Sequence, residues 1–259
     1  MGRTHAATGL LAGMALAPAL GLGTVHQAVV FAATTAGFAL LPDLDHPSAS
    51  ATRLFGWLTG AVSWLLRRAS AIVYAATKGP RDENVEGTHR HLSHTLLFAV
   101  GLGASVAAGC AAGGTWAVLA VLAVGLLLAV GVLGDWLLLA YAAAAAWWYF
   151  TASGGIEAQL ADISGWLGVA VAIGCVVHCL GDSLTESGCP FLFPLPIAGE
   201  TWYELRPPKP LRLHTGKKVE TRLVFPVVIA LCVLTAPGVR DHLVEIVRAT
   251  AATTAGAPR

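Results

Sequence analysis

The segment His89-Arg90-His91-Leu92-Ser93-His94-Thr95 places three imidazoles, a guanidinium and two hydroxyls in one short stretch, directly before a long apolar run. Only 12% of the chain is charged, and no Lys or Arg follows this stretch until Arg206. Imidazole is the commonest protein ligand of transition metals near neutral pH. On its own the stretch also fits a solvated basic loop ahead of a membrane helix. The choice between a metal-binding segment and a solvated loop depends on the residues in the rest of the chain.

Composition places the chain among integral membrane proteins. Its 259 residues are 56% hydrophobic, with a mean hydropathy of +0.68. Several apolar runs approach or exceed the ~20 residues that a spanning helix needs. The net charge is +1, so no basic field points to nucleic acid as a partner. The five cysteines form no C-x-x-C motif and are odd in number, which argues against a disulfide framework or a zinc ribbon. We expect an all-α, polytopic membrane helical bundle.

The N-terminal region reads as a pair of helices broken near Gly21–Thr24. Residues 1–23 also resemble a signal peptide, but a second apolar run, Ala28 to Leu41, follows directly. A hairpin would return the chain to its starting side. His5 could then meet the acidic segment that closes the second run, which contains Asp43, Asp45 and His46.

The segment from Leu54 to Ala76 differs from these runs. Apolar residues recur at helical spacing, while Ser63, Arg67 and Ser70 fall on the opposite face. Two arginines at its middle would make a spanning helix costly, so we expect an interfacial amphipathic helix.

The number of crossings after His94 tests whether the polar segments can share a site. Residues 116–150 are too long for one span, and Gly134-Asp135 offers a break. Splitting there gives four spans, 92–112, 116–133, 136–150 and 163–180, which return His178 to the side of His89. A single span over 116–150 would put the two on opposite faces.

The remaining segments complete the expected architecture. The proline-rich residues 186–220 predict a structured loop over the site. We expect one membrane-embedded domain over residues 1–236, then a tail over 237–259 with an amphipathic helix from Val239 to Thr250 and disorder from Ala251.

Four polar islands lie at the ends of apolar runs, and each contains a histidine. In the last one His178, Asp182 and Thr185 share a helix face. For one island alone, Asp43 and Asp45 could be caps and His178 a core histidine. Together, imidazole and carboxylate suit one or two divalent transition metal ions, zinc or manganese in particular, better than calcium.

The distribution of basic residues predicts the orientation. The turns opposite the islands, near residues 22–25, 112–115 and 151–157, carry no Lys or Arg. Basic residues accumulate on the side of the islands, so we expect the site to face the cytoplasm.

The order of these motifs resembles a known family. Thr4-His5, Leu41-Pro42-Asp43-Leu44-Asp45-His46, His89-Arg90-x-x-Ser93-His94-Thr95 and His178-x-x-x-Asp182-x-x-Thr185 are similar to the bacterial inner-membrane metal-dependent hydrolases under SOS (LexA) control. The resemblance covers about residues 4–225, although the insert at 48–88 looks long. It implies a membrane-embedded hydrolase with Glu220, in Thr215–Glu220, as an acid. The metal ligands that it implies are His5, Asp43, Asp45, His46, His89, His94, His178 and Asp182.

The resulting hypothesis is an integral membrane hydrolase that cleaves phosphoester bonds of lipid-like substrates at the cytoplasmic face. Asp43 or Asp45 would be the bridging ligand of the one or two metal ions. Arg90 would stabilise the developing oxyanion, and Asp45 and Glu220 would be the other catalytic residues. Membrane lipids are the expected partners. Two alternatives remain: a transporter that binds divalent metal, and a non-catalytic membrane scaffold.

Overall fold

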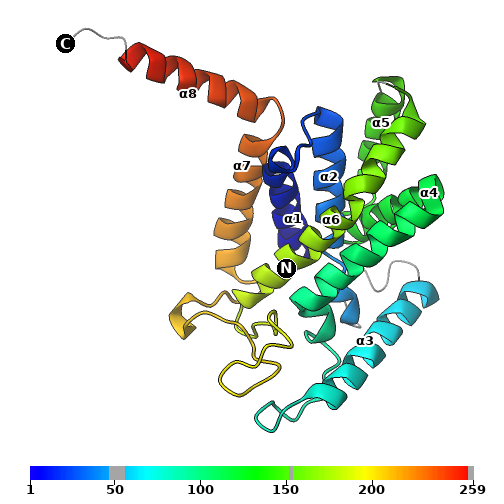
Figure 1. The fold of residues 1–259 in the computed structure, drawn as a ribbon. Helices are drawn as coiled ribbons and strands as arrows, with labels where there is room; N and C mark the ends of the chain where they lie inside the picture. Colours follow the sequence, from blue (N-terminus) through cyan, green and yellow to red (C-terminus); the bar gives the residue numbers. More distant parts are fainter. Residues whose placement is uncertain (47–55, 152–153, 256–259) are drawn as a thin grey trace.

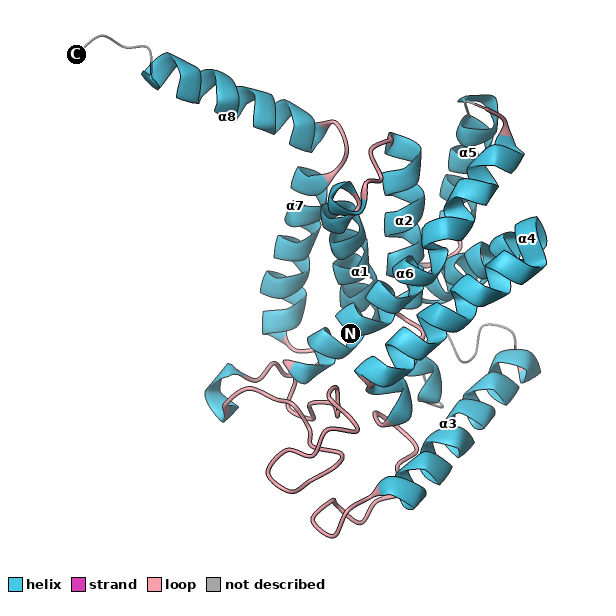
Figure 2. Cartoon of the chain, in the orientation of Figure 1, coloured by secondary structure: helices cyan, strands magenta, loops and turns pink. Residues whose placement is uncertain are grey.

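The computed structural model describes residues 1–46, 56–151 and 154–255. Over these ranges the chain contains helices and loops, with isolated β-bridges but no strand, so the predicted all-α fold is confirmed. The helices, shown in Figures 1 and 2, are α1 Gly2–Leu16, α2 Val25–Phe38, α3 Trp57–Thr77, α4 Leu96–Leu133, α5 Trp136–Thr151, α6 Ile156–Ser183, α7 Phe225–Thr235 and α8 Val239–Ala255.

Several of these helices are long and apolar enough to cross a membrane. In the part of the chain that the structure describes, three segments qualify: Val25–Asp45, Leu96–Leu133 and Ile156–Ser183. A fourth is added if the bent pair Glu220–Thr235 and Val239–Thr250 forms one span. The prediction of a polytopic membrane bundle is therefore confirmed.

The predicted hairpin of α1 and α2 is confirmed. Its turn uses Gly21 at a φ of 77°, and Thr24 caps α2 by accepting a hydrogen bond from Gln27 N. The two helices pack closely, since a Cβ at Gly13 would lie 2.4 Å from Ala32 Cα. Small residues permit such close backbone contact. The hairpin therefore places His5 and the acidic residues after α2 at the same end of the bundle.

Helix α4 reverses direction at Gly114. There φ is 55° and ψ is −144°, a conformation that glycine adopts readily and other residues rarely. A straight helix of this length would extend about 57 Å. Leu133 instead packs against the apolar cluster that contains Leu44, and Thr95 at the other end adjoins His94, whose ring contacts Asp45. Both ends of α4 thus lie near the same turn, and the predicted reversal at residues 112–115 is confirmed.

The break between α4 and α5 also follows the prediction. Trp136 starts a new helix after Leu133, and the end of α5 reaches the opposite end of the bundle, where Thr151 Oγ1 lies 2.9 Å from His26 Nε2. Helix α6 returns from there, beginning earlier than predicted, at Ile156. His178 and Asp182 therefore lie at the same end as His94, as the counting of crossings requires.

Helix α3 turns its polar stripe inward. Ser63 and Ser70 are buried, while Trp64, Leu65 and Ile72 are more than half exposed. Ser70 Oγ donates to Gly87 O at 2.6 Å and accepts from Leu92 N at 3.1 Å, so it fixes the loop that carries His89. An outward apolar stripe is what an interfacial helix needs. Leu54 and Phe55, at the start of the predicted helix, lie outside the described residues.

The proline-rich segment after α6 is a long loop, as predicted. Leu213 N donates to Leu184 O at 2.8 Å and Leu96 N donates to Phe191 O at 2.8 Å, so the loop joins the ends of α6 and α4. Glu220–Val224 forms a π-helical turn ahead of α7.

The C-terminal helix is longer than predicted. Helix α8 projects from the bundle at 72° to α7 and continues to Ala255 (Figure 1). The predicted disorder is therefore wrong for residues 251–255, where alanine favours the helix. Residues 256–259 lie outside the described part of the chain.

Candidate metal centre

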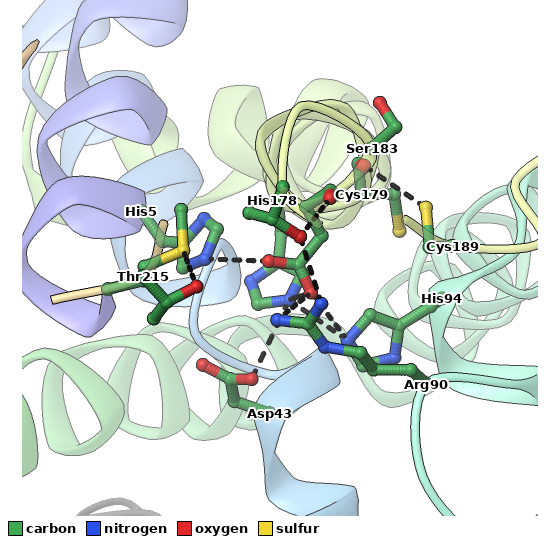
Figure 3. Close-up of polar contacts among 12 residues, drawn as sticks. His5, Asp43, Arg90, His94, His178, Cys179, Ser183, Cys189 and Thr215 are labelled. Atoms are coloured by element: carbon green, nitrogen blue, oxygen red, sulfur yellow. Dashed lines mark hydrogen bonds and ion pairs between the residues drawn. The ribbon is translucent and has the colours of Figure 1, made fainter. Parts of the chain in front are cut away.

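Four segments bring buried polar side chains together at one end of the bundle. His5 comes from the first turn of α1, and Asp43 from the 3-10 turn Pro42–Asp45 (η2) after α2. His94 ends the turn Leu92–His94 (η4) before α4, and His178 and Asp182 lie on the last turns of α6. Figure 3 shows the side chains of His5, Asp43, His94 and His178 pointing toward one another. All are buried except Asp43, whose side chain is 27% exposed.

Asp182 lies at the middle of this group. Its Oδ1 is 3.3 Å from His5 Nε2, and its Oδ2 is 3.3 Å from His94 Nε2 and 3.6 Å from His178 Nε2. Neither carboxylate oxygen forms a hydrogen bond of good geometry, although both are fully buried. A buried carboxylate without hydrogen bonds is costly unless a cation compensates it.

The ring nitrogens of His94 and His178 show what kind of cation fits. His178 Nδ1 lies 2.8 Å from Ala39 O, which can only accept, so Nδ1 donates and Nε2 faces the centre. Ser93 Oγ donates to Asp45 at 2.7 Å and so accepts from His94 Nδ1 at 3.0 Å, which turns the Nε2 of His94 inward too. The two Nε2 atoms are 3.2 Å apart. Two lone pairs this close need a proton or a metal ion between them.

Two groups of donors among the described residues are close enough to hold a metal ion. One is His5, His178 and Asp182, and the other is Asp43, His94 and His178. In each group the donor atoms lie within 4.8 Å of one another. His178 belongs to both, but its Nδ1 is already hydrogen-bonded, so it can coordinate one ion only. Mixed imidazole and carboxylate donors fit a divalent transition metal, as the sequence predicts.

The structure brings together five of the eight predicted ligands and places the other three around them. Asp45 is fully buried, and its carboxylate accepts from Ser93 Oγ, from Arg90 N at 2.9 Å and from His89 Nδ1 at 2.5 Å. It also lies 3.4 Å from His94 Nδ1. With its oxygens occupied in this way, Asp45 orients His94 from behind the centre.

His89 and His46 lie beside Asp45. His89 contacts its carboxylate, and the His46 and His89 ring centroids are 4.7 Å apart. Neither imidazole belongs to the two donor groups.

The carboxylates of Asp45 and Asp182 strongly shift the pKa of His94. Burial lowers this pKa, but the two carboxylates outweigh burial and raise it to about 10.

Arg90 reaches the centre from a strained backbone position. Its φ is 55°, which is uncommon for a residue other than glycine and is typical of functional sites. Its guanidinium lies 3.1 Å from Asp182 Oδ2 and donates to Thr185 Oγ1 at 3.1 Å. Arg90 therefore borders the donor groups.

Glu220, in the π-helical turn before α7, contacts the start of α1. It accepts from Thr4 Oγ1 at 2.7 Å and from Gly216 N at 2.6 Å, and the Met1 amino group is 3.7 Å away. These contacts fix the first turn of α1, which carries His5.

The sequence motifs contain Ser93 and Thr185 but did not indicate what they do. Ser93 fixes the His94 ring, and Thr185 fixes Arg90. The adjacency of Ser93 to His94 was an available signal. Ala39 orients His178 through its backbone carbonyl, and the sequence does not show such a role because any residue has this carbonyl.

Comparison with known protein families identifies one family that matches this chain. A family model described as YdjM inner membrane protein matches residues 1–139 and 136–244. The two matched segments include every residue of the candidate metal centre. No curated protein and no solved structure matches the chain.

Proposed function

The chain belongs to the YdjM inner membrane protein family, and from that premise and the geometry around Asp182 we propose that it is a metal-dependent hydrolase. The observation that carries the proposal is a buried carboxylate that faces three imidazole Nε2 atoms without a hydrogen bond of good geometry, with the Arg90 guanidinium 3.1 Å away as its cationic neighbour. Five donors converge there from four separate segments. A packing role would not need ionisable groups in such a place.

The residues divide into ligands and positioning groups. His5, His178 and Asp182 would hold the ion, and Asp43 and His94 would complete its shell. When bound, a divalent transition metal ion such as zinc or manganese supplies Lewis acidity and a water of lowered pKa. Arg90 would stabilise negative charge on the scissile group, with its guanidinium held by Thr185. Asp45 would keep the Nε2 of His94 directed at the ion.

The substrate we propose is a phosphoester of a lipid-like molecule. The centre lies at the ends of the helices that can cross a membrane, and α3, whose apolar stripe faces outward, packs on the turns that carry Asp43 and His94. Headgroups lie at this depth of a bilayer. In the reaction water adds to phosphorus, one P–O ester bond breaks, and the departing alcohol takes a proton. The side that we propose is the cytoplasmic one, because the basic residues lie there.

Elemental analysis of the detergent-purified protein tests the centre. We expect about one transition metal ion per chain in the wild type, and loss of it in Asp182→Asn and His178→Ala, since water replaces a lost ligand poorly. His214→Ala is the matched control, because this histidine is 61% exposed and pairs with Glu186 in the loop. Wild-type protein without stoichiometric metal would refute the proposal.

Hydrolysis assays test the chemistry. The metal-loaded wild type should release product from a panel of phospholipids and phosphodiesters. Arg90→Lys should keep its metal but act about tenfold more slowly or worse, because an ammonium cannot reproduce the guanidinium fork. Protein that carries metal, hydrolyses nothing on the panel and moves divalent metal across vesicles would favour the transporter instead.

A further inference from the structure

A cavity lies beside the candidate metal centre. It has a volume of about 400 Å³ and is lined by the end of α3 and by loop residues around 82–91 and 200–206. His89 lines it, and the His89 ring centroid is 5.9 Å from that of His94. The cavity is therefore separated from the proposed reaction site by about one imidazole ring.

Acidic side chains dominate the lining. Asp82 has structural partners, since it accepts from Gly79 N and Trp202 N. Glu204 pairs with Arg206 at 3.0 Å. The other three carboxylates form no hydrogen bond or ion pair within the described residues. They are Glu83, Glu86 and Glu200.

The carboxylates share one electrostatic environment. Burial raises the pKa of Glu204, Arg206 opposes the shift, and Glu83 and Glu200 add to it. One guanidinium thus leaves the cavity with excess negative charge, which a cation in the cavity would relieve.

The remaining wall is aromatic. The Trp202 ring lies 5.3 Å from that of Tyr74 and 5.5 Å from that of His91, measured between centroids. Neither donor group that could hold a metal ion includes a residue of this cavity, within the described residues. Trp202 and Tyr74 are buried, at 4% and 2% exposed, and pack with Phe193, so they close the cavity with an apolar wall. The carboxylates are the groups that suit an organic ammonium ion.

We propose that this cavity is the headgroup subsite of the hydrolase and selects phosphoesters whose alcohol carries an ammonium group. The inference rests on the proposed function, because it assigns the substrate class of the same site. Phosphate at the metal centre would place a short amino alcohol across His89, in the acidic cavity. A headgroup alcohol without an ammonium group, such as glycerol, would gain no such attraction from Glu83, Glu86 and Glu200.

The test compares two short-chain lipids with identical acyl chains, phosphatidylethanolamine and phosphatidylglycerol, on the metal-loaded full chain. We expect kcat/KM to be about tenfold higher for the ethanolamine lipid, as for a modest charge selectivity. Glu83→Gln/Glu86→Gln/Glu200→Gln should bring the ratio close to one without changing metal content. Glu86→Gln alone should shift the ratio part of the way, should the triple variant fold poorly. Glu157→Gln, at the opposite end of α6, is the matched control and should keep the wild-type ratio.

A binding measurement separates this inference from the proposed function. In titration calorimetry, phosphoethanolamine should bind the wild type more tightly than glycerol phosphate, and the triple variant should lose the difference. Hydrolysis of both lipids at equal rates would overturn the inference and leave the hydrolase intact. Selective binding that depends on the glutamates, without hydrolysis of either lipid, would support the cavity and overturn the hydrolase. Equal binding of both probes would overturn the inference.

Discussion

The carboxylate of Glu220 accepts a hydrogen bond of 2.7 Å from the hydroxyl of Thr4, the residue that precedes the buried imidazole of His5. Gly216 N donates to the other carboxylate oxygen at 2.6 Å. A residue from the π-helical turn before α7 thus holds the first turn of α1. The resemblance implied a catalytic acid here, whereas these contacts favour a residue that positions His5.

The two roles of Glu220 predict different phenotypes. Glu220→Gln can still accept from Thr4 and loses only the bond from the backbone N of the exposed Gly216, so it should keep its metal and most of its hydrolysis. Glu220→Ala leaves the buried Thr4 hydroxyl without its acceptor, which costs about 1–3 kcal/mol of stability, and should weaken metal binding through His5. Thermal unfolding and metal analysis measure both effects. A Gln variant with full metal content and no turnover would establish the catalytic role instead.

Asp45 gives a second prediction. Since its carboxylate holds His94, Asp45→Asn should lower the affinity for zinc by about 10–100-fold, the usual effect of losing a partner behind a ligand. Competition with a chelator measures the affinity. Asp82→Asn, in the neighbouring cavity, is the control and should bind zinc as the wild type does. Loss of an oxygen ligand in the X-ray absorption spectrum of Asp45→Asn would show direct coordination, as the sequence predicted.

The sequence could predict that the donor residues converge, but it could not predict which of them would be a ligand and which would position a ligand. The hairpin of α1 and the even number of crossings after His94 depend on apolar length and on breaks at Gly114 and Gly134, which are local signals. The proposed division between His94 as a ligand and Asp45 as its support depends on which oxygens of Asp45 are already occupied. That follows from tertiary contacts such as Ser93 with Asp45, which spacing does not show.

The inward stripe of α3 illustrates the same limit. Helical periodicity separated Ser63 and Ser70 from the apolar face, but it could not say which face meets the protein. In water the apolar face would be buried. At a membrane the lipid takes that face, and Ser70 is free to hold the loop before His94.

Protonation of His94 leads to a third prediction. Its pKa is about 10, above the ordinary 6.5, so in the ion-free protein the ring is protonated at neutral pH and loses its proton only as pH rises through 10. Metal must displace that proton, so zinc binding at pH 7 should release about one proton. Calorimetry in two buffers of different ionisation enthalpy measures the release. Heats that do not depend on the buffer would contradict the prediction, and Asp45→Asn should release less.

Orientation in the membrane is the last prediction. The first turn of α2 and the last turn of α5 meet through His26 and Thr151, on the side of the bundle opposite the metal centre. The turns there carry no Lys or Arg, whereas the loops on the side of the centre are basic. Because basic loops stay in the cytoplasm, Asn84 and Lys209 should be cytoplasmic and Gly23 periplasmic.

Labelling of introduced cysteines decides this orientation, since the five native cysteines are all buried. A membrane-impermeant maleimide added from the periplasmic side should modify Gly23→Cys and leave Asn84→Cys and Lys209→Cys unmodified. Inverted vesicles should give the opposite pattern. Periplasmic labelling of both Asn84→Cys and Lys209→Cys would reverse the orientation and expose the centre to the periplasm. Labelling of only one of them would separate His89 from the proline-rich loop and overturn the four crossings on which the shared site depends.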